Sequence, residues 1–412
     1  MSLGALRDRN FRLLFIGQAT SAFGDRLVPI ALAFAVLDLT GSATDLGLVL
    51  AAQTLPMLLL VAFAGVWADR LPRQLVMLTS DLVRCGTQGA TAALLLLHEA
   101  HIWELIVLQA AYGAADAFFT PAMSGLIPAT AGPGRLREAN ALMSLSRSAV
   151  GVLGPAIGGT LVALISPGAA LAVDAATFLV SAVSLFMLQL NRIPRASVGT
   201  SVLTELREGF AEVRSRTWLW VMIVYFGIFT LLAFPAFNVL GPYVAKHSLG
   251  GAGAWAIILT AGAAGFLIGG ALALRVGSTR PLLYSELACL LAALPPILLG
   301  LHVAVALIAA GAMVRSIGLA WGDALWHTTV QEQIPEAAIS RVSALDWTGT
   351  LVLNPIGFAL VGPLAAVIGI STTLIVTGSL TVVATLAVLA VPSVRNLRTQ
   401  PTSKPEPAPN AV

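Results

Sequence analysis

Charged residues stand inside several long apolar stretches of this 412-residue chain. Where such a stretch crosses a membrane, an ionisable side chain near its centre costs at least about 2.5–3.5 kcal/mol. Charges kept at that cost are candidates for ion or substrate binding. The candidates are Asp25, Arg26, Asp116, Arg315 and Asp323.

Polar or small residues accompany these charges at helical spacing, so each set shares one helix face. The companions are Gln18 and Ser21 for Asp25, Gln109 and Tyr112 for Asp116, and Gly322 and Trp326 for Asp323. Burial disfavours the charged form of a carboxyl group, so the three aspartates are candidates for coupling to protons or other cations. Arg26 and Arg315 are candidates for counter-ions or for ligands of an anionic substrate. Static ion pairs that hold helices together remain an alternative for each residue.

The composition indicates a membrane protein. Only 10% of the residues are charged, 57% are hydrophobic, and the mean hydropathy is +0.88. Soluble domains have about 25% charged residues, so a soluble enzyme, a nucleic-acid-binding protein and a disordered protein are all disfavoured. A spanning helix needs about 20 mostly apolar residues, and this length predicts twelve spans in an all-α integral membrane fold. The predicted spans are 11–37, 45–66, 75–97, 103–128, 139–165, 168–190, 217–243, 252–274, 281–301, 303–330, 342–367 and 370–392.

Lysine and arginine predict the orientation. With both termini in the cytoplasm, the inner loops and tails hold eighteen of the 23 Lys and Arg residues, and the outer loops hold only Lys246. This bias is the positive-inside signal. We expect two six-helix bundles, residues 1–190 and 217–392, joined by a cytoplasmic linker at 191–216 and followed by a disordered cytoplasmic tail at 393–412. The linker contains an amphipathic stretch, which forms either a helix on the membrane surface or a solvated helix.

The two halves of the sequence repeat one another. Asp116 matches Asp323 at an offset of 207 residues, and Asp81 matches Glu286 at an offset of 205. Both halves start on the same side, so they are parallel repeats, which place a substrate near the bilayer midplane between the halves. The repeat therefore predicts an alternating-access carrier. Asp81 lies near the inner end of its span, and Asp81, Glu286 and Arg84 are interpreted as structural.

Residues 65–73 resemble the signature loop of the major facilitator superfamily, and the motif positions here are Gly65, Asp69, Arg70 and Arg73. Pro72 and Gln74 stand where the family usually has a glycine and an arginine. The resemblance implies that this loop closes the cytoplasmic interface between the halves. Asp69 would meet a helix N-terminus, where the partial positive charge favours a carboxylate, and the arginines would pair with carboxylates at cytoplasmic helix ends.

Residues 151–159 resemble the fifth-span signature of the drug/proton antiporters in that superfamily. The motif positions are Gly151, Gly154, Pro155, Gly158 and Gly159. Small residues let helices approach closely, so the resemblance implies a seal around the cavity rather than a set of ligands. Across residues 8–392 the pattern looks like the branch of macrolide-efflux proteins and enterobactin exporters, in which the first, fourth, seventh and tenth spans would line a central cavity.

These features predict a secondary active transporter that exports a small hydrophobic or amphipathic molecule by proton-coupled antiport. A drug, an antibiotic, a siderophore or another secondary metabolite would fit. An importer or a lipid flippase of the same fold is an alternative, and a membrane-embedded lipid-modifying enzyme is a less favoured one. The expected partners are the substrate, protons and membrane lipids, with no nucleic acid, for a monomer in the inner membrane of a bacterium.

Several sequence motifs of other functional classes are missing. There is no Walker loop, no Gly-x-Ser-x-Gly elbow and no His-Glu-x-x-His in the sequence. We therefore expect no ATP-driven motor within the chain and no enzymatic activity. The histidines lack metal-ligand spacing, so neither a metal site nor a cofactor is expected.

Overall fold

The computed structural model of the chain describes residues 4–132, 134–190 and 202–399. It leaves out the side chains of residues 62–70, 120, 124, 202–206, 336 and 337. The described residues form α-helices, short 3-10 and π-helical turns and connecting loops, with no strand among them. The predicted all-α class is confirmed.

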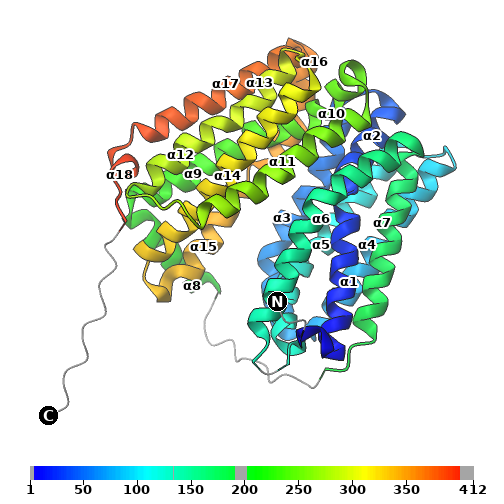
Figure 1. The fold of residues 1–412 in the computed structure, drawn as a ribbon, viewed down its shortest axis with the longest axis horizontal. Helices are drawn as coiled ribbons and strands as arrows, with labels where there is room; N and C mark the ends of the chain where they lie inside the picture. The colour runs from blue at the N-terminus through cyan, green and yellow to red at the C-terminus, as the bar shows by residue number, and fades with distance from the viewer. Residues whose placement is uncertain (1–3, 133, 191–201, 400–412) are drawn as a thin grey trace.

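Seven helices build the first bundle (Figure 1). They are α1 (Arg9–Asp25), α2 (Val28–Thr40), α3 (Ala43–Arg70), α4 (Arg73–Leu96), α5 (Ile102–Thr130), α6 (Leu136–Leu164) and α7 (Pro167–Phe186), preceded by the 3-10 turn η1 (Gly4–Arg7). Buried apolar side chains such as Phe11, Leu14 and Met77 form a core at one end of this bundle. A second apolar core, which includes Leu32 and Leu46, continues into the other half of the chain.

The second bundle follows the short helix α8 (Val202–Ser215). Its elements are α9 (Thr217–Pro235), η2 (Ala236–Leu240), α10 (Gly241–Val244), η3 (Ala245–Leu249), α11 (Ala252–Ala273), α12 (Pro281–Cys289), η4 (Leu290–Ala293), α13 (Leu294–Gly300), α14 (Val305–Gln333), α15 (Glu336–Leu351), α16 (Asn354–Ile368), α17 (Ile370–Leu389) and α18 (Pro392–Arg395). The turns η2 and η3 are π-helical and η4 is a 3-10 turn. The repeat is visible in helix length, because α5 and α14 both have 29 residues and α7 and α17 both have 20.

Prolines divide three of the predicted spans into shorter helices. A proline has no N–H to bond the carbonyl four residues earlier, so a helix tends to end there. The helix α1 ends at Asp25, four residues before Pro29, and α15 ends at Leu351, four residues before Pro355. A proline pair at the start of α13 likewise follows the turn η4. Each break lets the span change direction inside the membrane.

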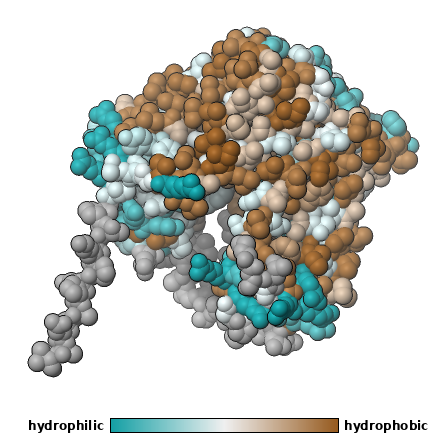
Figure 2. Space-filling model, viewed as in Figure 1, coloured by the Kyte–Doolittle hydropathy of each residue, from teal (hydrophilic) through white to brown (hydrophobic). Residues whose placement is uncertain are grey.

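Ten described helical segments are long and apolar enough to cross a membrane. The other two of the twelve predicted spans are α1 with α2, which the proline break shortens, and α4, which contains the charged residues Arg73, Asp81 and Arg84. Figure 2 shows apolar residues over most of the visible face of both bundles, with hydrophilic residues gathered near their ends. This distribution suits a lipid environment, and the fold is that of a twelve-helix integral membrane protein.

The two bundles pack together at one end of the molecule and diverge toward the other (Figure 1). A Cβ added to Gly47 of α3 would meet the backbone oxygen of Phe358, and a Cβ added to Gly362 of α16 would meet the backbone of Thr44. The backbones of α3 and α16 therefore touch. We call the end with this contact the closed end and the opposite end the open end, where Figure 2 shows a hollow between the bundles.

The linker and the tail are partly described. Residues 191–201 of the expected linker lie outside the described residues, and the rest of it forms α8, whose Val213 is buried against the second bundle. The predicted tail begins at 393, but α18 extends to Arg395 and Val394 is fully buried. Order therefore continues past the predicted boundary, because an apolar side chain anchors this turn. Residues 400–412 lie outside the described residues.

Candidate functional site

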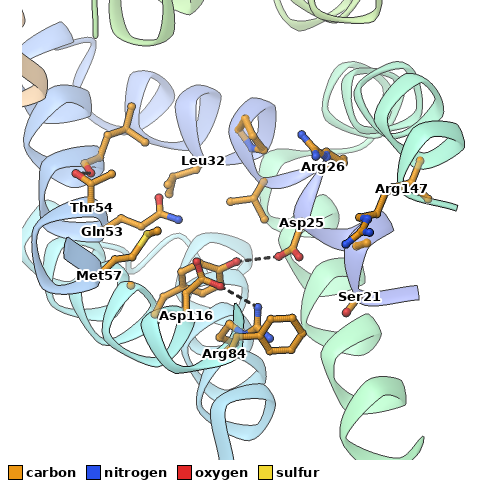
Figure 3. Close-up of a pocket in the computed structure, with 18 of the residues that line it drawn as sticks. Ser21, Asp25, Arg26, Leu32, Gln53, Thr54, Met57, Arg84, Asp116 and Arg147 are labelled. Atoms are coloured by element: carbon orange, nitrogen blue, oxygen red, sulfur yellow. Dashed lines mark hydrogen bonds and ion pairs between the residues drawn. The ribbon is translucent and has the colours of Figure 1, made fainter. Parts of the chain in front are cut away.

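A cavity of about 640 Å³ lies between the bundles. Most of its wall comes from α1 to α6, and Phe234, Asn238, Asn354 and Phe358 contribute from the second bundle. Figure 3 shows polar and charged side chains entering it from several helices. The residues predicted from the sequence that line the cavity are Gln18, Ser21, Asp25, Arg26, Tyr112 and Asp116.

Asp25 is the last residue of α1, at the proline break. Its Oδ1 accepts a hydrogen bond of 2.9 Å from the hydroxyl of Tyr112 in α5. Ser21 and Gln18 line the same cavity, one and two turns earlier in α1, and Gln18 Nε2 donates to Ser181 Oγ of α7 at 3.2 Å. The helical spacing predicted for this stripe thus brings its polar groups to one wall.

Arg84 of α4 joins two carboxylates at the base of the cavity. It pairs with Asp81 one turn earlier, and its Nη1 lies 3.2 Å from Asp116 Oδ1 of α5. Its guanidinium also lies over the rings of Phe119 and Phe178, 4.1 and 4.5 Å from their centroids. The side chain of Arg84 is 1% exposed and that of Asp116 is 34% exposed, so the pair bridges the interior and the cavity. The structural interpretation of Arg84 was incomplete, since this residue also lines the cavity.

Gln109 lies behind the cavity wall instead of on it. It is fully buried, because α5 turns it toward α4, and its Nε2 donates to Gln88 Oε1 at 3.1 Å. Gln88 Nε2 in turn donates to Asp174 Oδ2 of α7 at 2.9 Å. A Cβ on Gly24 would meet the side chains of Asp174 and Thr177, so this glycine permits their close approach to α1. The sequence indicates no partner for Asp174. In the structure, the hydrogen-bonded chain from Gln109 through Gln88 holds its carboxylate behind the cavity wall.

Two glycines of the antiporter-like segment pack against the residues that connect α1 and α2. A Cβ on Gly154 would meet the side chain of Arg26, and a Cβ on Gly158 would lie 3.1 Å from the Cα of Leu27. Pro155 lies between them, buried inside α6. These glycines therefore position Arg26, which lines the cavity, through contact with its aliphatic stem.

The other two glycines of this segment have different surroundings. A Cβ on Gly159 would meet the Cβ of Ala256 in α11, so this position lies in the contact between the two bundles. A Cβ on Gly151 would have no heavy atom within 4 Å. The motif thus combines a contact within one bundle, a contact between bundles and one position with open space.

Arg315 of α14 lies next to the cavity among aromatic rings. Its guanidinium carbon is 4.9 Å from the ring centroid of Phe237 and 5.8 Å from that of Phe234, which itself lines the cavity. Cation–π contact of this kind is favourable when the cation has lost water. The ring of Phe234 therefore lies between the Arg315 guanidinium and the cavity.

The remaining candidates on α14 lie outside the cavity lining. The Asp323 side chain is 61% exposed and lies 3.5 Å from His327 one turn later. Trp326 is buried and donates from Nε1 to Asp346 Oδ2 at 2.9 Å, and Gly322 packs against α12. The repeat-related Asp116 and Asp323 therefore have different environments, because Gly322 and Trp326 of α14 contact α12 and α15 while Asp323 is exposed.

The signature-loop residues lie at the end of α3 and the start of α4. Gly65, Asp69 and Arg70 belong to the last turns of α3, and the side chains of Asp69 and Arg70 lie outside the described part of the chain. Arg73 begins α4, and its guanidinium occupies the space that a Cβ on Gly125 of α5 would take. Arg73 is therefore held between two helices of the first bundle.

Gln74, which replaces an arginine usual in that loop, caps a neighbouring helix. Its Nε2 donates to the backbone oxygens of Leu185 and Leu188 at 2.7 and 3.1 Å. These carbonyls belong to the end of α7 and the turn after it, where backbone acceptors lack intrahelical partners. At this position the chain therefore has an amide that caps α7 instead of a positively charged arginine.

Sequence reasoning missed several amides on the cavity wall. Gln53, Asn238 and Asn354 line the cavity, and Asn238 lies in the π-helical turn η2. Each is a polar residue within an apolar span, which was the available signal. Turns of π-helix often mark functional sites. No group of three His, Cys, Asp or Glu side chains suited to a metal ion occurs among the residues described.

Comparison with known sequences gives a consistent result. Residues 14–350 match the sequence profile of the Major Facilitator Superfamily. An uncharacterized MFS-type transporter of Bacillus subtilis, YfiS, is 26% identical over 93% of each chain. The multidrug efflux pump Tap of Mycolicibacterium fortuitum is 27% identical, covering 88% of this chain and 90% of that one. Macrolide efflux protein A of Streptococcus pyogenes is 22% identical over 64% of this chain and 65% of its own length.

Solved structures show the same fold at low sequence identity. The nucleoside transporter NupG superposes with a TM-score of 0.73 at 13% identity, covering 92% of this chain and 98% of that chain. A bacterial homologue of the human lysosomal transporter Spinster, in an inward-facing and occupied conformation, gives a TM-score of 0.73 at 14% identity, covering 98% and 100%. With the helical fold and the profile match across most of its length, the chain belongs to the Major Facilitator Superfamily of membrane transporters.

Proposed function

We propose that this transporter exports small amphipathic molecules and is driven by proton antiport. Similar proteins named for macrolide and multidrug efflux support the direction and the class of substrate. The observation that carries the proton coupling is the position of Asp25 and Asp116, two carboxyl groups on the wall of the cavity beside a single buried guanidinium, that of Arg84.

Charge balance explains why these carboxyl groups suit proton coupling. Arg84 serves both Asp81 and Asp116, while Asp25 has a hydrogen bond from Tyr112 as its closest polar contact. A buried charge without a full partner is costly, so binding of a proton within this group relieves that cost. A substrate that brings a positive charge or hydrogen-bond donors to Asp116 competes with the proton for the same oxygen atoms. Such competition for one site produces antiport.

The apolar part of the wall suits the body of an amphipathic molecule. Methionine and phenylalanine side chains cover it: Met57, Met123, Met143, Phe119, Phe234 and Phe358. Methionine is flexible and polarisable, so it adapts to ligands of different shape. A few polar groups within a largely apolar wall are typical of small-molecule sites.

We place the open end of the molecule in the cytoplasm. Arg135 and Arg280 cap helices at the open end, whereas Lys246 is the one lysine or arginine among the described residues at the closed end. This distribution follows the positive-inside rule. The halves 1–190 and 217–392 would then form the two moving bundles of a monomer in a bacterial inner membrane, with both termini cytoplasmic and the cavity open to the cytoplasm.

Closure of the cavity on the cytoplasmic side is assigned to the signature loop. We infer that Asp69, Arg70 and Arg73 connect the bundles at that side when the outer side opens. On the outer side, Gly158 and Gly159 permit the close packing that keeps the cavity sealed in the present conformation. The transporter would therefore alternate between two tight contacts, one at each end.

The direction and the energy source are tested together in everted membrane vesicles of a host without its own major exporters. Erythromycin and ethidium, a macrolide and a cationic dye, serve as probes, and respiration supplies the proton gradient. Uptake that a protonophore abolishes, and that Asp25→Asn with Asp116→Asn removes, is the expected result. Uptake that persists without a gradient, or that occurs only in right-side-out vesicles, would contradict proton-driven export.

A further inference from the structure

The cavity wall is divided by charge. Figure 3 shows Arg84 and Asp116 on one side of the cavity, Arg26 and Arg147 on the side of α6, and Asp25 between them. All five residues line the cavity. The guanidinium of Arg84 is paired with carboxylates, so its charge is neutralised locally. The positive charge that remains available to a ligand lies on the α6 side.

Arg26 and Arg147 differ from Arg84 in their partners. Both are exposed to the cavity, and neither guanidinium forms an ion pair or a side-chain hydrogen bond with another described residue. Arginine presents several N–H donors in a planar arrangement that matches a carboxylate or a phosphate. The neighbouring Asp25 interacts electrostatically with Arg26 but its carboxylate is hydrogen-bonded to Tyr112, so the donors of the two guanidinium groups stay available to a ligand.

The packing of Arg26 shows that its position is built into the fold. Its Cγ lies 3.1 Å from the place of a Cβ on Gly154, and its Cβ lies closer still. Any side chain at Gly154 would displace the stem of Arg26. The backbone N–H of Arg26 bonds to Phe23 O at 3.2 Å, which fixes the turn that carries the residue. The backbone hydrogen bond and the packing of the aliphatic stem therefore together hold the Arg26 guanidinium at the cavity.

We propose that Arg26 and Arg147 form an anion subsite, and that this subsite favours molecules that carry a carboxylate or phosphate group together with a cationic or hydrogen-bond-donating group over molecules that lack the anionic group. The anionic group binds the two arginines, and the other polar group lies toward Asp116. The apolar body contacts the methionine and phenylalanine side chains. This inference rests on the proposed transport function and adds to its amphipathic substrate class a preference for zwitterionic molecules.

The test compares two dyes that differ in one group. Rhodamine B is a zwitterion with a carboxylate, and its ethyl ester has the same ring system and cation without that negative charge. Binding of each dye to the purified full-length protein in uncharged detergent is measured by fluorescence anisotropy. We expect the wild-type protein to bind rhodamine B more tightly than the ester by about tenfold, which corresponds to about 1.4 kcal/mol.

Variants identify the residues responsible. Arg26→Gln, Arg147→Gln and their combination are expected to remove the preference for rhodamine B and to leave the affinity for the ester within about twofold. Arg26→Lys and Arg147→Lys, which keep the charge, should retain part of the preference. Arg275→Gln is the matched control, because Arg275 is exposed at the end of α11 and does not line the cavity. Size-exclusion chromatography and thermal unfolding confirm that each variant is folded.

Three results would overturn the subsite: equal affinity of the wild-type protein for the two dyes, no binding of rhodamine B, or a preference that persists in the double glutamine variant. The two wild-type measurements need no variant, so a misfolded variant does not decide the outcome. The anionic group could come from a lipid headgroup or from a soluble molecule. Phosphatidylglycerol added to nanodiscs of phosphatidylcholine distinguishes these sources, since only a lipid ligand would compete with rhodamine B in an arginine-dependent way.

Binding without a membrane gradient separates this inference from the proposed export function. A failure of proton-driven uptake in vesicles would leave the dye preference unchanged. Conversely, proton-driven export with no dye preference would overturn the anion subsite alone.

Discussion

Arg84 of α4 and Asp116 of α5 form an ion pair of 3.2 Å between adjacent helices, with the carboxylate partly open to the cavity and the guanidinium almost fully buried. Among the described residues, no arginine forms an ion pair with Asp323, the repeat partner of Asp116. Asp323 faces a largely open surface and lies 3.5 Å from His327. The two aspartates are equivalent in the sequence repeat, but their environments differ.

This difference predicts unequal effects on transport. Asp116→Asn removes a cavity carboxylate, and we expect the rate of probe uptake into everted vesicles to fall by about tenfold or more. Asp323→Asn changes a side chain that is 61% exposed and should leave the rate within about twofold of the wild type. Initial rates normalised to the amount of inserted protein provide the comparison. An equal loss in both variants would show that the repeat, and not the cavity, decides the function of these residues.

A second prediction concerns stability of the first bundle. Arg84→Gln leaves the fully buried Asp81 without its cation, and breaking a buried pair in this way costs about 3–5 kcal/mol. We expect a clear drop in the melting temperature of the purified protein. Adding Asp81→Asn to Arg84→Gln removes the stranded charge and should recover part of the loss. Equal melting temperatures of the single and double variants would exclude the Asp81 pair as the cause.

The sequence predicts the spans well because each needs only a sufficient apolar length. Helical spacing also predicts which residues share a face with Asp25 and with Tyr112, and the resemblance to the transporter family implies that these faces line the cavity. The sequence does not predict that Gln109 is turned toward Gln88, because the rotation of α5 depends on contacts with α4 and α7. The sequence also does not predict that Arg84 lines the cavity. Its long side chain reaches the cavity from α4, a helix that contributes little else to the wall.

Two glycines of one motif are predicted to respond in opposite ways. A methyl group at Gly154 would collide with the side chain of Arg26, and overpacking of this kind typically costs about 1–3 kcal/mol. Gly151 has open space around it, so Gly151→Ala should be neutral or stabilising by up to about 1 kcal/mol through helix propensity. Thermal unfolding of Gly154→Ala and Gly151→Ala distinguishes them. A lower melting temperature for Gly151→Ala than for Gly154→Ala would contradict the packing described here.

The closed end contains a polar contact between the bundles. Lys246 of η3 donates from Nζ to Leu37 O and to Asp38 Oδ1 of α2, each at 2.6 Å. The carbonyl belongs to the last turn of α2, where the helix dipole also favours a cation. The lysine side chain is 26% exposed and the aspartate 53%, so the pair is worth only about 0.2–1 kcal/mol.

Loss of this contact should favour the conformation that is open at the present closed end. We expect Lys246→Met to increase the labelling rate of Asn238→Cys by a membrane-impermeant maleimide from that side, by up to about fivefold, in a background without Cys85 and Cys289. Lys246→Arg keeps the cation and is the control. An unchanged rate in Lys246→Met would mean that apolar packing between α3 and α16 alone keeps this end closed.

The most direct measurement is proton release on addition of substrate to everted vesicles that hold a preformed, acid-inside pH gradient, followed with a pH-sensitive fluorescent dye. The account predicts that adding a transported probe releases protons from wild-type vesicles, that Asp25→Asn and Asp116→Asn greatly reduce this release, and that Asp323→Asn preserves it. Full proton release in the Asp25→Asn, Asp116→Asn double variant, or transport of the probe by the wild type with no proton release, would contradict the claim that these cavity carboxyl groups couple protons to export.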